Sequence, residues 1–492
     1  MLSHLPILQV IIPLLAAPAC LLLDRGRIAW AFSCAVAIVS LAISLSLLHQ
    51  VSGAGPLSYE LGGWDAPWGI EYRIDLLSAY VLLVVNGVAT LVLVAARSSV
   101  AAEIDEAKQP LFYVLYMLCL AGLLGIIATG DIFNVFVFLE ISSLATYALI
   151  ALGRDRRALW AAYQYLIVGT IGATFILVGI GFLYSLTGTL NMADLAQRLP
   201  ALAESASVYA AFAFLVVGVC LKLALFPLHL WLPNAYAYAP SIVTAFLAAT
   251  ATKVAVYLLL RFHFSVFGAS FTDPVLPLEG IFLVLGIAGV FVASIVAIFE
   301  DNIKRLFAYS SVAQIGYMVI GMGIGSATGV QATLLHLFNH ALMKGALFLA
   351  LAAVVYRLGG ANFSHIRGLG RTMPLTMAAI VVAGLSLVGV PGTVGFITKW
   401  YLVMAAINGS HWLLVPAILL GSLLALVYVW RIVEAAYFSE PVAGTETCRE
   451  APLGLLLAMW LLVIANVYFG LDTRLPVAAS DGAVRLLMGG AG

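Results

Sequence analysis

The chain has 492 residues, of which 63% are hydrophobic and only 9% are charged, and its mean hydropathy is +1.10. A soluble protein carries charge on roughly a quarter of its residues, so this composition excludes a soluble fold and indicates an integral membrane protein. The formal net charge is zero, which provides no basic surface for nucleic acid, and the five cysteines show no spacing typical of a zinc or iron–sulfur site.

Hydrophobic segments long enough to cross a bilayer follow one another along nearly the whole chain. A spanning helix needs roughly 20 apolar residues. About fourteen candidate segments meet this need, and they begin near Leu5, Ile28, Leu76, Leu111, Ile132, Leu159, Val208, Ile242, Leu276, Lys304, Val330, Pro374, Trp412 and Pro452. The connections are mostly short, so we expect one all-α, polytopic membrane domain over residues 1–492.

The basic residues predict the orientation, because loops that face the cytoplasm carry an excess of lysine and arginine. With the N-terminus outside, the inward loops hold Arg25, Arg27, Arg97, Lys108, Arg154, Arg156, Arg157, Lys304, Arg305, Arg357, Arg367, Arg371, Arg431 and Arg449. The outward loops hold only Arg73, Arg198, Arg261, Arg474 and Arg485. We therefore expect a multi-pass protein of the cell inner (plasma) membrane with both termini outside.

One acidic residue, Glu140, lies well inside a predicted span, in DIFNVFVFLEISSLATYALIALGRDRR. A carboxylate in lipid stays ionised only if a cation lies near it. We expect Lys222, which ends a long apolar run of its own, to be that partner. The alternative is a protonated Glu140 that hydrogen-bonds within the helix bundle.

Four basic residues fall inside predicted spans, and all four are lysines: Lys222, Lys253, Lys344 and Lys399. Arginine stays charged in any protein environment, whereas a buried lysine can release its proton. The set is therefore typical of proton-binding groups. Structural pairing, or side chains that extend to the interface near a helix end, is the alternative, most readily for Lys253 or Lys399.

Two of these lysines lie beside expected helix breaks. Pro227 follows Lys222 closely, and Pro391 with Gly392 interrupts the segment LSLVGVPGTVGFITKW before Lys399. Interrupted helices at matching places in two chain halves indicate inverted repeats with functional sites at the breaks. Carbonyl groups freed at a break can bind water or a charged side chain.

A third group of titratable residues lies in LLHLFNHALMKGALF, residues 334–348. His336, His340 and Lys344 are four residues apart, so a helix places them along one face at intervals of roughly 6 Å. Histidine titrates nearest neutral pH, which suits a proton relay. Packing histidines and a metal site are the alternatives, although no third metal ligand is evident in the sequence.

These segments together resemble a known family. The matching motifs are KLALFPLHLWLPNAYAYAPS, TKVAVYLLLR, DNIKRLFAYSSVAQIGYMVIG, HLFNHALMKGALF and GVPGTVGFITKW. They resemble the proton-translocating, antiporter-like membrane subunits of respiratory complex I and of Mrp-type cation/proton antiporters, over residues from about 70 to 435. LYSLTGTLNMADLAQRLP, AAYQYLIVG and a lysine at position 399 are most similar to the D-type member of the Mrp antiporters.

The resemblance implies fourteen helices, some of them broken, with two inverted five-helix repeats. It implies N-terminal helices in residues 1–109, a first repeat in 110–265, a second in 275–438 and a last helix in 450–472.

By motif match, the resemblance also implies roles for individual residues. Glu140 and Lys222 take the places of the family's glutamate–lysine pair. Lys253 and Lys344 match bridging positions on a central hydrated axis, and Lys399 matches the terminal lysine. Two positions depart from the pattern: Gly392 replaces a second proline, and Gln164 replaces a lysine common in complex I subunits.

The implied function is that of a proton-translocating subunit in a multi-subunit monovalent cation (Na⁺)/proton antiporter. Its partners would be other membrane subunits, the lipid bilayer, protons, and Na⁺ or K⁺ as the exchanged cation. No motif for nucleotide, flavin, quinone or metal is present, so we expect no cofactor and no redox chemistry of its own. The alternatives are an M- or N-type subunit of complex I or of a related hydrogenase or bicarbonate-uptake complex, a stand-alone solute carrier, and a membrane scaffold.

Overall fold

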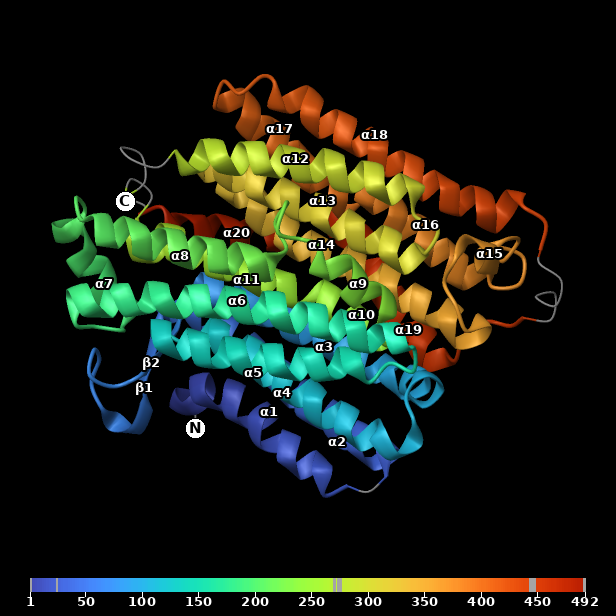
Figure 1. The fold of residues 1–492 in the computed structure, drawn as a ribbon, viewed down its shortest axis with the longest axis horizontal. Helices are drawn as coiled ribbons and strands as arrows, with labels where there is room; N and C mark the ends of the chain where they lie inside the picture. Colours follow the sequence, from blue (N-terminus) through green and yellow to red (C-terminus); the bar gives the residue numbers. More distant parts are fainter. Residues whose placement is uncertain (1, 24, 269–270, 272–276, 442–447, 490–492) are drawn as a thin grey trace.

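The computed structural model describes residues 2–23, 25–268, 271, 277–441 and 448–489. Long helices run side by side along the longest axis of the molecule (Figure 1). Within this described part of the chain, 12 helices are long and apolar enough to cross a membrane, and three shorter apolar helices accompany them. The all-α, polytopic fold expected from the sequence is confirmed, and each expected span corresponds to a helix or a broken helix.

The N-terminal part consists of three long helices and a small hairpin. Its elements are η1 (Leu2–His4), α1 (Leu5–Leu21), α2 (Gly26–Ala54), β1 (Leu57–Glu60), η2 (Leu61–Gly63), β2 (Glu71–Ile74), α3 (Leu76–Glu103) and η3 (Glu106–Lys108). The strands β1 and β2 pair antiparallel, with Leu57 opposite Ile74. The Asp75 side chain caps α3 by accepting a hydrogen bond from the Ser78 amide.

The first half of the bundle follows. Its elements are α4 (Gln109–Ala128), α5 (Ile132–Ala151), α6 (Arg156–Thr187), α7 (Met192–Arg198), η4 (Leu199–Leu202), α8 (Ala206–Leu223), α9 (Trp231–Tyr238), α10 (Ser241–Ala249), α11 (Ala251–Leu260) and the π-helical turn η5 (Arg261–Phe267). The break expected at Pro227 lies between α8 and α9. A second interruption, at Thr250, separates α10 from α11.

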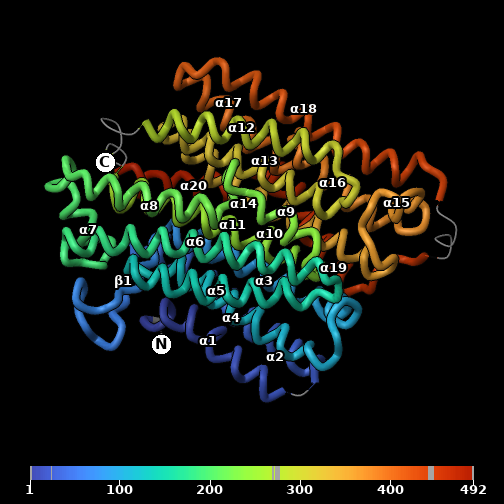
Figure 2. Tube along the Cα trace, in the orientation of Figure 1, coloured from blue at the N-terminus to red at the C-terminus, as the bar shows by residue number. Residues whose placement is uncertain are grey.

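The second half and the C-terminal helices complete the chain. The second half contains α12 (Leu278–Phe299), α13 (Ile303–Gly323), α14 (Ala327–Leu358), α15 (Phe363–Ile366), α16 (Pro374–Val388), α17 (Val394–Asn408), α18 (Leu414–Val433) and η6 (Glu434–Phe438). The C-terminal helices are α19 (Leu453–Leu471) and α20 (Arg474–Leu487). Both pack against α3 and α14, so the C-terminal helices contact a helix of the N-terminal part (Figure 2).

Local geometry recurs in the two halves. Isolated bridges join Asp131 to Asn191 in the first half and Asn302 to Asn362 in the second. Each bridge closes a segment that contains a helix of 32 residues, α6 or α14, which ends at a left-handed glycine. This recurrence is what two repeats would produce, while the boundaries at 110–265 and 275–438 stay a prediction.

The most buried helices form the centre of the bundle. Side chains of α10, α11, α13 and α14 are almost all buried, whereas α12, α18 and α19 expose leucine and isoleucine on their outer faces. In a membrane protein those apolar outer faces meet lipid, and the polar groups gather inside. All four lysines predicted within spans are buried in this interior.

Candidate functional site

The seven residues singled out from the sequence all lie on helices of the bundle interior. Lys222, Lys253, His336, His340, Lys344 and Lys399 are buried, and the side chain of Glu140 is 24% exposed. They are distributed over both halves, on α5, α8, α11, α14 and α17. A row of this kind, within a hydrophobic bundle, is expensive to bury and therefore indicates function.

Glu140 and Lys222 face each other between α5 and α8. The distance from Lys222 Nζ to Glu140 Oε1 is 4.0 Å, the outer limit of an ion pair. Lys222 Nζ donates a closer hydrogen bond to Ser143 Oγ, at 2.8 Å, and another to the Tyr147 hydroxyl, at 3.3 Å. The structure thus brings the predicted pair together, with two hydroxyl groups that the sequence analysis did not identify.

The two hydroxyl groups follow from helix periodicity. Ser143 and Tyr147 lie three and seven residues after Glu140, so α5 presents all three on one face. The spacing E-I-S-S-L-A-T-Y carried this signal in the sequence. The Glu140 Oε1 atom accepts no hydrogen bond within the described part of the chain, which leaves it available to a proton or a water molecule.

A small internal cavity of about 40 Å³ adjoins Lys222. It is lined by Ser143, Thr146 and Tyr165 on one side and by Val254, Ala255 and Leu258 of α11 on the other. This volume is enough for one water molecule, whose share of the liquid is roughly 30 Å³. The cavity therefore lies between Lys222 and the helix that carries Lys253.

Lys253 is completely buried at the interruption between α10 and α11. Its Nζ atom donates to the Ala248 carbonyl oxygen at 2.5 Å and lies 3.4 Å from Thr252 Oγ1. Ala248 is one residue from the end of α10, so its carbonyl group is freed where the helix is interrupted at Thr250. The idea that Lys253 extends to the membrane interface is wrong, because its side chain has no exposure.

His336 and His340 stack on one face of α14, as the four-residue spacing predicted. Their ring centroids are 5.6 Å apart and the rings are nearly parallel, at 2°. Neither nitrogen of either ring has a hydrogen-bond partner within the described residues. Those residues also contain no group of three or more histidine, cysteine, aspartate or glutamate side chains placed to hold a metal. Four unpaired ring nitrogens in a buried stripe are suited to exchange protons with transient water.

Lys344, one helical turn after His340, is held by α13. Its Nζ atom donates to the Phe307 carbonyl oxygen at 2.7 Å and makes a short contact with Ser310 Oγ. The hydrogen bonds of Lys253 and Lys344 in the described part of the chain therefore run to backbone and hydroxyl oxygens, and none reaches another residue of the row. Proton transfer between them requires water or movement.

Lys399 lies on α17, beside the break expected at Pro391 and Gly392, which separates α16 from α17. We call this the second break. Its Nζ atom donates to the carbonyl oxygens of Leu387 and Val388, at 3.0 and 2.7 Å. Both carbonyls belong to the last turn of α16, where no further helical turn follows to donate amide hydrogens to them. The expectation that freed carbonyls would bind a charged side chain holds at this break.

Tyr317 of α13 connects Lys399 to the histidine stripe. The Lys399 Nζ atom lies 5.2 Å from the centre of the Tyr317 ring, and the same ring lies 6.2 Å from that of His336. Sequence analysis did not single out Tyr317, which lies in an otherwise apolar run of a buried helix. The row thus extends from α17 through Tyr317 to α14.

Two basic residues that the sequence analysis placed in loops lie in helices instead, where Lys304 is buried and Arg261 is partly buried. Lys304 is 5% exposed in the first turn of α13 and donates to the Ala239 carbonyl oxygen at 3.1 Å. Arg261 lies in η5 with a side chain that is only 13% exposed. The hydropathy pattern located both near span ends, but it could not show that neighbouring helices cover them.

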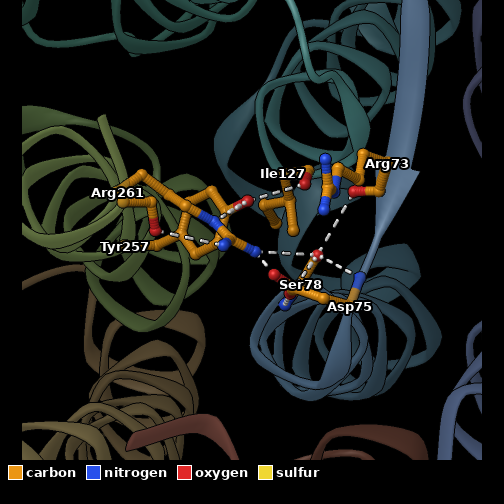
Figure 3. A network of polar contacts seen from close by, with 7 residues as sticks. Arg73, Asp75, Ser78, Ile127, Tyr257 and Arg261 are labelled. Carbon is orange, nitrogen blue, oxygen red and sulfur yellow. Dashed lines mark hydrogen bonds and ion pairs between the residues drawn. The ribbon is translucent and has the colours of Figure 1, made fainter. Parts of the chain in front are cut away.

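Arg261 forms an ion pair with Asp75, the residue that caps α3 (Figure 3). The guanidinium group also contacts Tyr257, Ser78 and Ser265. Burial alone would raise the pKa of Asp75, but the Arg261 charge and hydrogen bonds from Arg261 and Ser78 hold this pKa below its ordinary value. The pair joins α3 to η5 at the wall of a cavity of about 600 Å³ that Arg73 also lines.

Gln164, one of the two departures from the family pattern, lies on α6. Its side-chain oxygen accepts a hydrogen bond from Asn234 of α9, at 2.8 Å. It thus fixes the short helix α9 that follows the first break.

Comparisons with known proteins agree with this geometry. Residues 129–425 match the family model described as "NADH:quinone oxidoreductase/Mrp antiporter, TM". The chain is 44% identical to the N-type subunit of the NADH-quinone oxidoreductase of Desulforudis audaxviator, over 92% of this chain and 91% of that protein. It is 29% identical to the D-type subunit of the Na(+)/H(+) antiporter of Alkalihalophilus pseudofirmus, over 95% and 94%.

A solved structure shows the same fold. A chain in the structure of the Mrp complex from Dietzia sp. DQ12-45-1b superimposes with a TM-score of 0.90 and 24% sequence identity. The match covers 99% of this chain and 97% of that one. The overall arrangement of helices is therefore shared with a chain of that Mrp complex.

Proposed function

Because the chain belongs to the NADH:quinone oxidoreductase/Mrp antiporter membrane family, we propose that it is a proton-translocating subunit of a multi-subunit monovalent cation/proton antiporter. The observation that carries the proposal is the buried row from Glu140 and Lys222 to Lys399. Its members are groups that can bind and release protons, and α-helix breaks adjoin both end lysines. Protons cross, and Na⁺ is the cation exchanged for them.

In this mechanism, the two halves of the chain provide two half-channels. Lys222 exchanges protons with Glu140 and with the water-sized cavity at its side. Lys253, the His336–His340 stripe and Lys344 carry protons along the centre, and Lys399 is the terminal group of the second half. The repeat boundaries that we assign are 110–265 and 275–438.

The arrangement of these titratable residues also argues against a stand-alone solute carrier. A carrier for an organic solute needs a pocket in which polar groups converge on one ligand. Here the polar groups are titratable and strung over five helices, and the cavity beside Lys222 is large enough for water alone. A membrane scaffold would have no need to bury four lysines.

Neutralising Glu140 tests the function. We expect Glu140→Gln, in inverted vesicles that contain the whole complex, to abolish the cation-dependent dissipation of a pH gradient while the complex still assembles. Glu140→Asp retains an ionisable group and should keep part of the rate. If Glu140→Gln transported at the wild-type rate, the pair would be structural and the proposed function would lose its mechanism.

A second candidate is the N-type subunit of complex I or of a related respiratory complex. The 44% identity to an N-type subunit of a NADH-quinone oxidoreductase favours it. Both candidates use the same proton row, so the partners decide between them. Purification of the tagged protein from its own membrane should yield small antiporter subunits for the first function and peripheral iron–sulfur subunits for the second.

We also propose that both termini lie outside the plasma membrane. The loops expected on each side do share an end of the molecule. One cavity is lined by Arg154, Arg157 and Lys304, and the cavity at the opposite end by Arg73 and Arg261. We name the end with the first cavity the basic end, and it lies to the right in Figure 1. By the excess of basic residues this end faces the cytoplasm.

Labelling tests this orientation. Asp155→Cys in a Cys448→Ser background should react with a membrane-impermeant thiol reagent in inverted vesicles and not in intact cells. Cys448 is replaced because the other four cysteines are buried. Reaction of Asp155→Cys from outside intact cells would reverse the assignment.

A further inference from the structure

A cavity of about 550 Å³ lies at the basic end of the bundle, where the α3, α5, α9 and α14 helices end and α13 begins. Among the residues that line it are the charged or titratable side chains Glu103, Arg154, Asp155, Arg157, Tyr238, Lys304 and His365. Arg154, Asp155 and Arg157 are exposed, and Arg157 pairs with Asp155. Lys304 differs from them because it is buried to 5% exposure.

Lys304 and Glu103 lie on either side of the turn that joins α9 to α10. Lys304 Nζ donates to the carbonyl oxygen of Ala239 at 3.1 Å. Glu103 Oε2 accepts from the amide and the hydroxyl group of Ser241, both at 2.9 Å. Glu103 is also the acidic group whose charge acts on Lys304. Buried Lys304 and partly buried Glu103 thus both line the cavity and hold the same turn.

The same helix that carries Lys304 holds the central lysine of the row. Lys344 Nζ is bound by Phe307 O and Ser310 Oγ, which lie three and six residues after Lys304 on α13. At 1.5 Å per residue, these positions are roughly 5 and 9 Å further along the helix. The hydroxyl group of Ser311 lies there too, 3.0 Å from the Phe307 carbonyl oxygen. Three oxygen atoms of α13 therefore follow Lys304 within about two turns, and two of them bind the Lys344 ammonium group.

Resting on the proposed function, we propose that Lys304 is a further proton-transfer residue, which takes protons from water in the basic-end cavity and passes them along α13 to Lys344. In the uptake step an O–H bond of a protonated water breaks and an N–H bond forms on the neutral amine of Lys304. In the transfer step an N–H bond of the Lys304 ammonium group breaks, and an N–H bond forms at the end of the relay on the neutral amine of Lys344. Water or the hydroxyl groups of Ser310 and Ser311 relay the proton, and each accepts one as it gives one up.

The competing explanation is that Lys304 only caps the C-terminal end of α9. A cap of this kind needs one donor for the Ala239 carbonyl, which a neutral side chain could provide without a buried charge. Arginine would also provide it. The basic residues at the other proposed proton sites of the interior are lysines or histidines, whereas the exposed basic residues around this cavity, Arg154 and Arg157, are arginines.

Accessibility tests the first half of the proposal without any transport assay. Lys304→Cys in a Cys448→Ser background should react with a membrane-impermeant maleimide applied at the basic end. Ser311→Cys, at 1% exposure deeper on α13, is the matched control and should not react. If Lys304→Cys resisted the reagent from both sides of the membrane, the cavity would not supply Lys304 with water.

Substitution by arginine tests the second half. Lys304→Arg keeps the charge and a donor for Ala239 but cannot release its proton. We expect the complex to assemble and the rate of cation-dependent pH-gradient dissipation to fall at least tenfold. Lys108→Arg makes the same change at an exposed lysine paired with Asp105, and it should leave the rate unchanged. Lys304→His, which titrates near neutral pH, should recover part of the rate.

The outcomes separate this proposal from the proposed function. Full transport by Lys304→Arg, with Glu140→Gln inactive, would reduce Lys304 to a structural cap and leave the function intact. Full transport by Glu140→Gln would contradict the proposed function itself. Failure of Lys304→His to recover any rate, while Lys304→Arg is inactive, would also overturn the proton-transfer role.

Discussion

The two broken helices hold their lysines in different ways. At the first break, Lys222 precedes the interruption and its ammonium group lies among two hydroxyl groups and the Glu140 carboxylate. At the second break, Lys399 follows the interruption and donates to two backbone carbonyl oxygens. The first lysine thus has an ionisable partner, and the second is held by neutral dipoles of the helix end.

The carbonyl groups at the two helix ends also have different partners. At the first break, the carbonyl oxygen of Leu221 accepts from the Ala224 amide, at 3.2 Å, and from the indole nitrogen of Trp231, at 3.0 Å. Lys222 donates instead to side chains of α5. At the second break, Lys399 itself donates to Leu387 and Val388. In the mechanism that we propose, Lys222 therefore exchanges its proton beside a charged partner, whereas Lys399 exchanges its proton beside the neutral carbonyl groups of a helix end.

The first prediction concerns the hydrogen bond between Lys222 and the Tyr147 hydroxyl group. A methyl group at Gly169 would collide with the Tyr147 hydroxyl and lie 3.3 Å from Lys222 Nζ. The rigid tyrosine must then move away from the lysine. A hydrogen bond to a charged group contributes about 1.5–3 kcal/mol, so Gly169→Ala should slow transport about tenfold or more.

Gly181→Ala is the matched control for that experiment, because it lies on the same helix and a methyl group there contacts nothing within 4 Å. Both variants should assemble, and the pH-gradient assay in vesicles compares them. Equal rates for the two variants would show that the Tyr147 contact is irrelevant to Lys222.

The second prediction concerns the second break and should have a smaller effect. Gly389 has a φ of +88°, and a methyl group there would lie 2.7 Å from Lys399 Cδ. Gly392 has a φ of +85°, but its methyl group would contact only Leu471, at 3.9 Å. Alanine at either site should destabilise the protein similarly, by about 1–2 kcal/mol, because both need left-handed backbone.

Only Gly389→Ala displaces Lys399 from its carbonyl partners. Although both variants should lose similar thermal stability, only Gly389→Ala should also reduce the transport rate several-fold. Thermal unfolding of the purified complex and the vesicle assay measure the two quantities separately. Equal transport by Gly389→Ala and Gly392→Ala would contradict a role for the Leu387 and Val388 carbonyls.

The third prediction concerns the stripe between the two breaks and should have the smallest effect. His336→Ala removes one of two stacked rings and leaves space beside His340 and Tyr317. A water molecule that fills this space costs roughly 0–2 kcal/mol in lost entropy, so transport should slow several-fold and not stop. Complete loss of transport with normal assembly would show that the imidazole itself is indispensable.

Much of the fold could be predicted from the sequence, because hydropathy and proline positions act locally. The predicted segments that begin near Leu5, Ile132 and Pro374 correspond to helices that begin at those residues. The spacing of His336, His340 and Lys344 predicted their shared face, and the stacked rings of the two histidines agree with it.

What the sequence did not reveal depends on contacts between distant segments. Lys304 looked like a loop residue, because its partner, the Ala239 carbonyl group, lies 65 residues earlier in the chain. Arg261 likewise pairs with Asp75, 186 residues earlier in the chain. The break in the sequence predicted that freed carbonyls could bind a charged side chain, but it could not predict which carbonyls bind Lys399, because every residue has such a group.

The central claim is that the lysines at the breaks must release their protons, and Lys399→Arg tests it most directly. The substitution keeps the positive charge and nearly the reach of the side chain, but arginine stays protonated. The measurement is the dissipation of a pH gradient after cation is added to inverted vesicles that contain the assembled complex. We predict normal assembly and no transport. Transport at the wild-type rate would show that Lys399 contributes only its charge, and the proton row would have to end elsewhere.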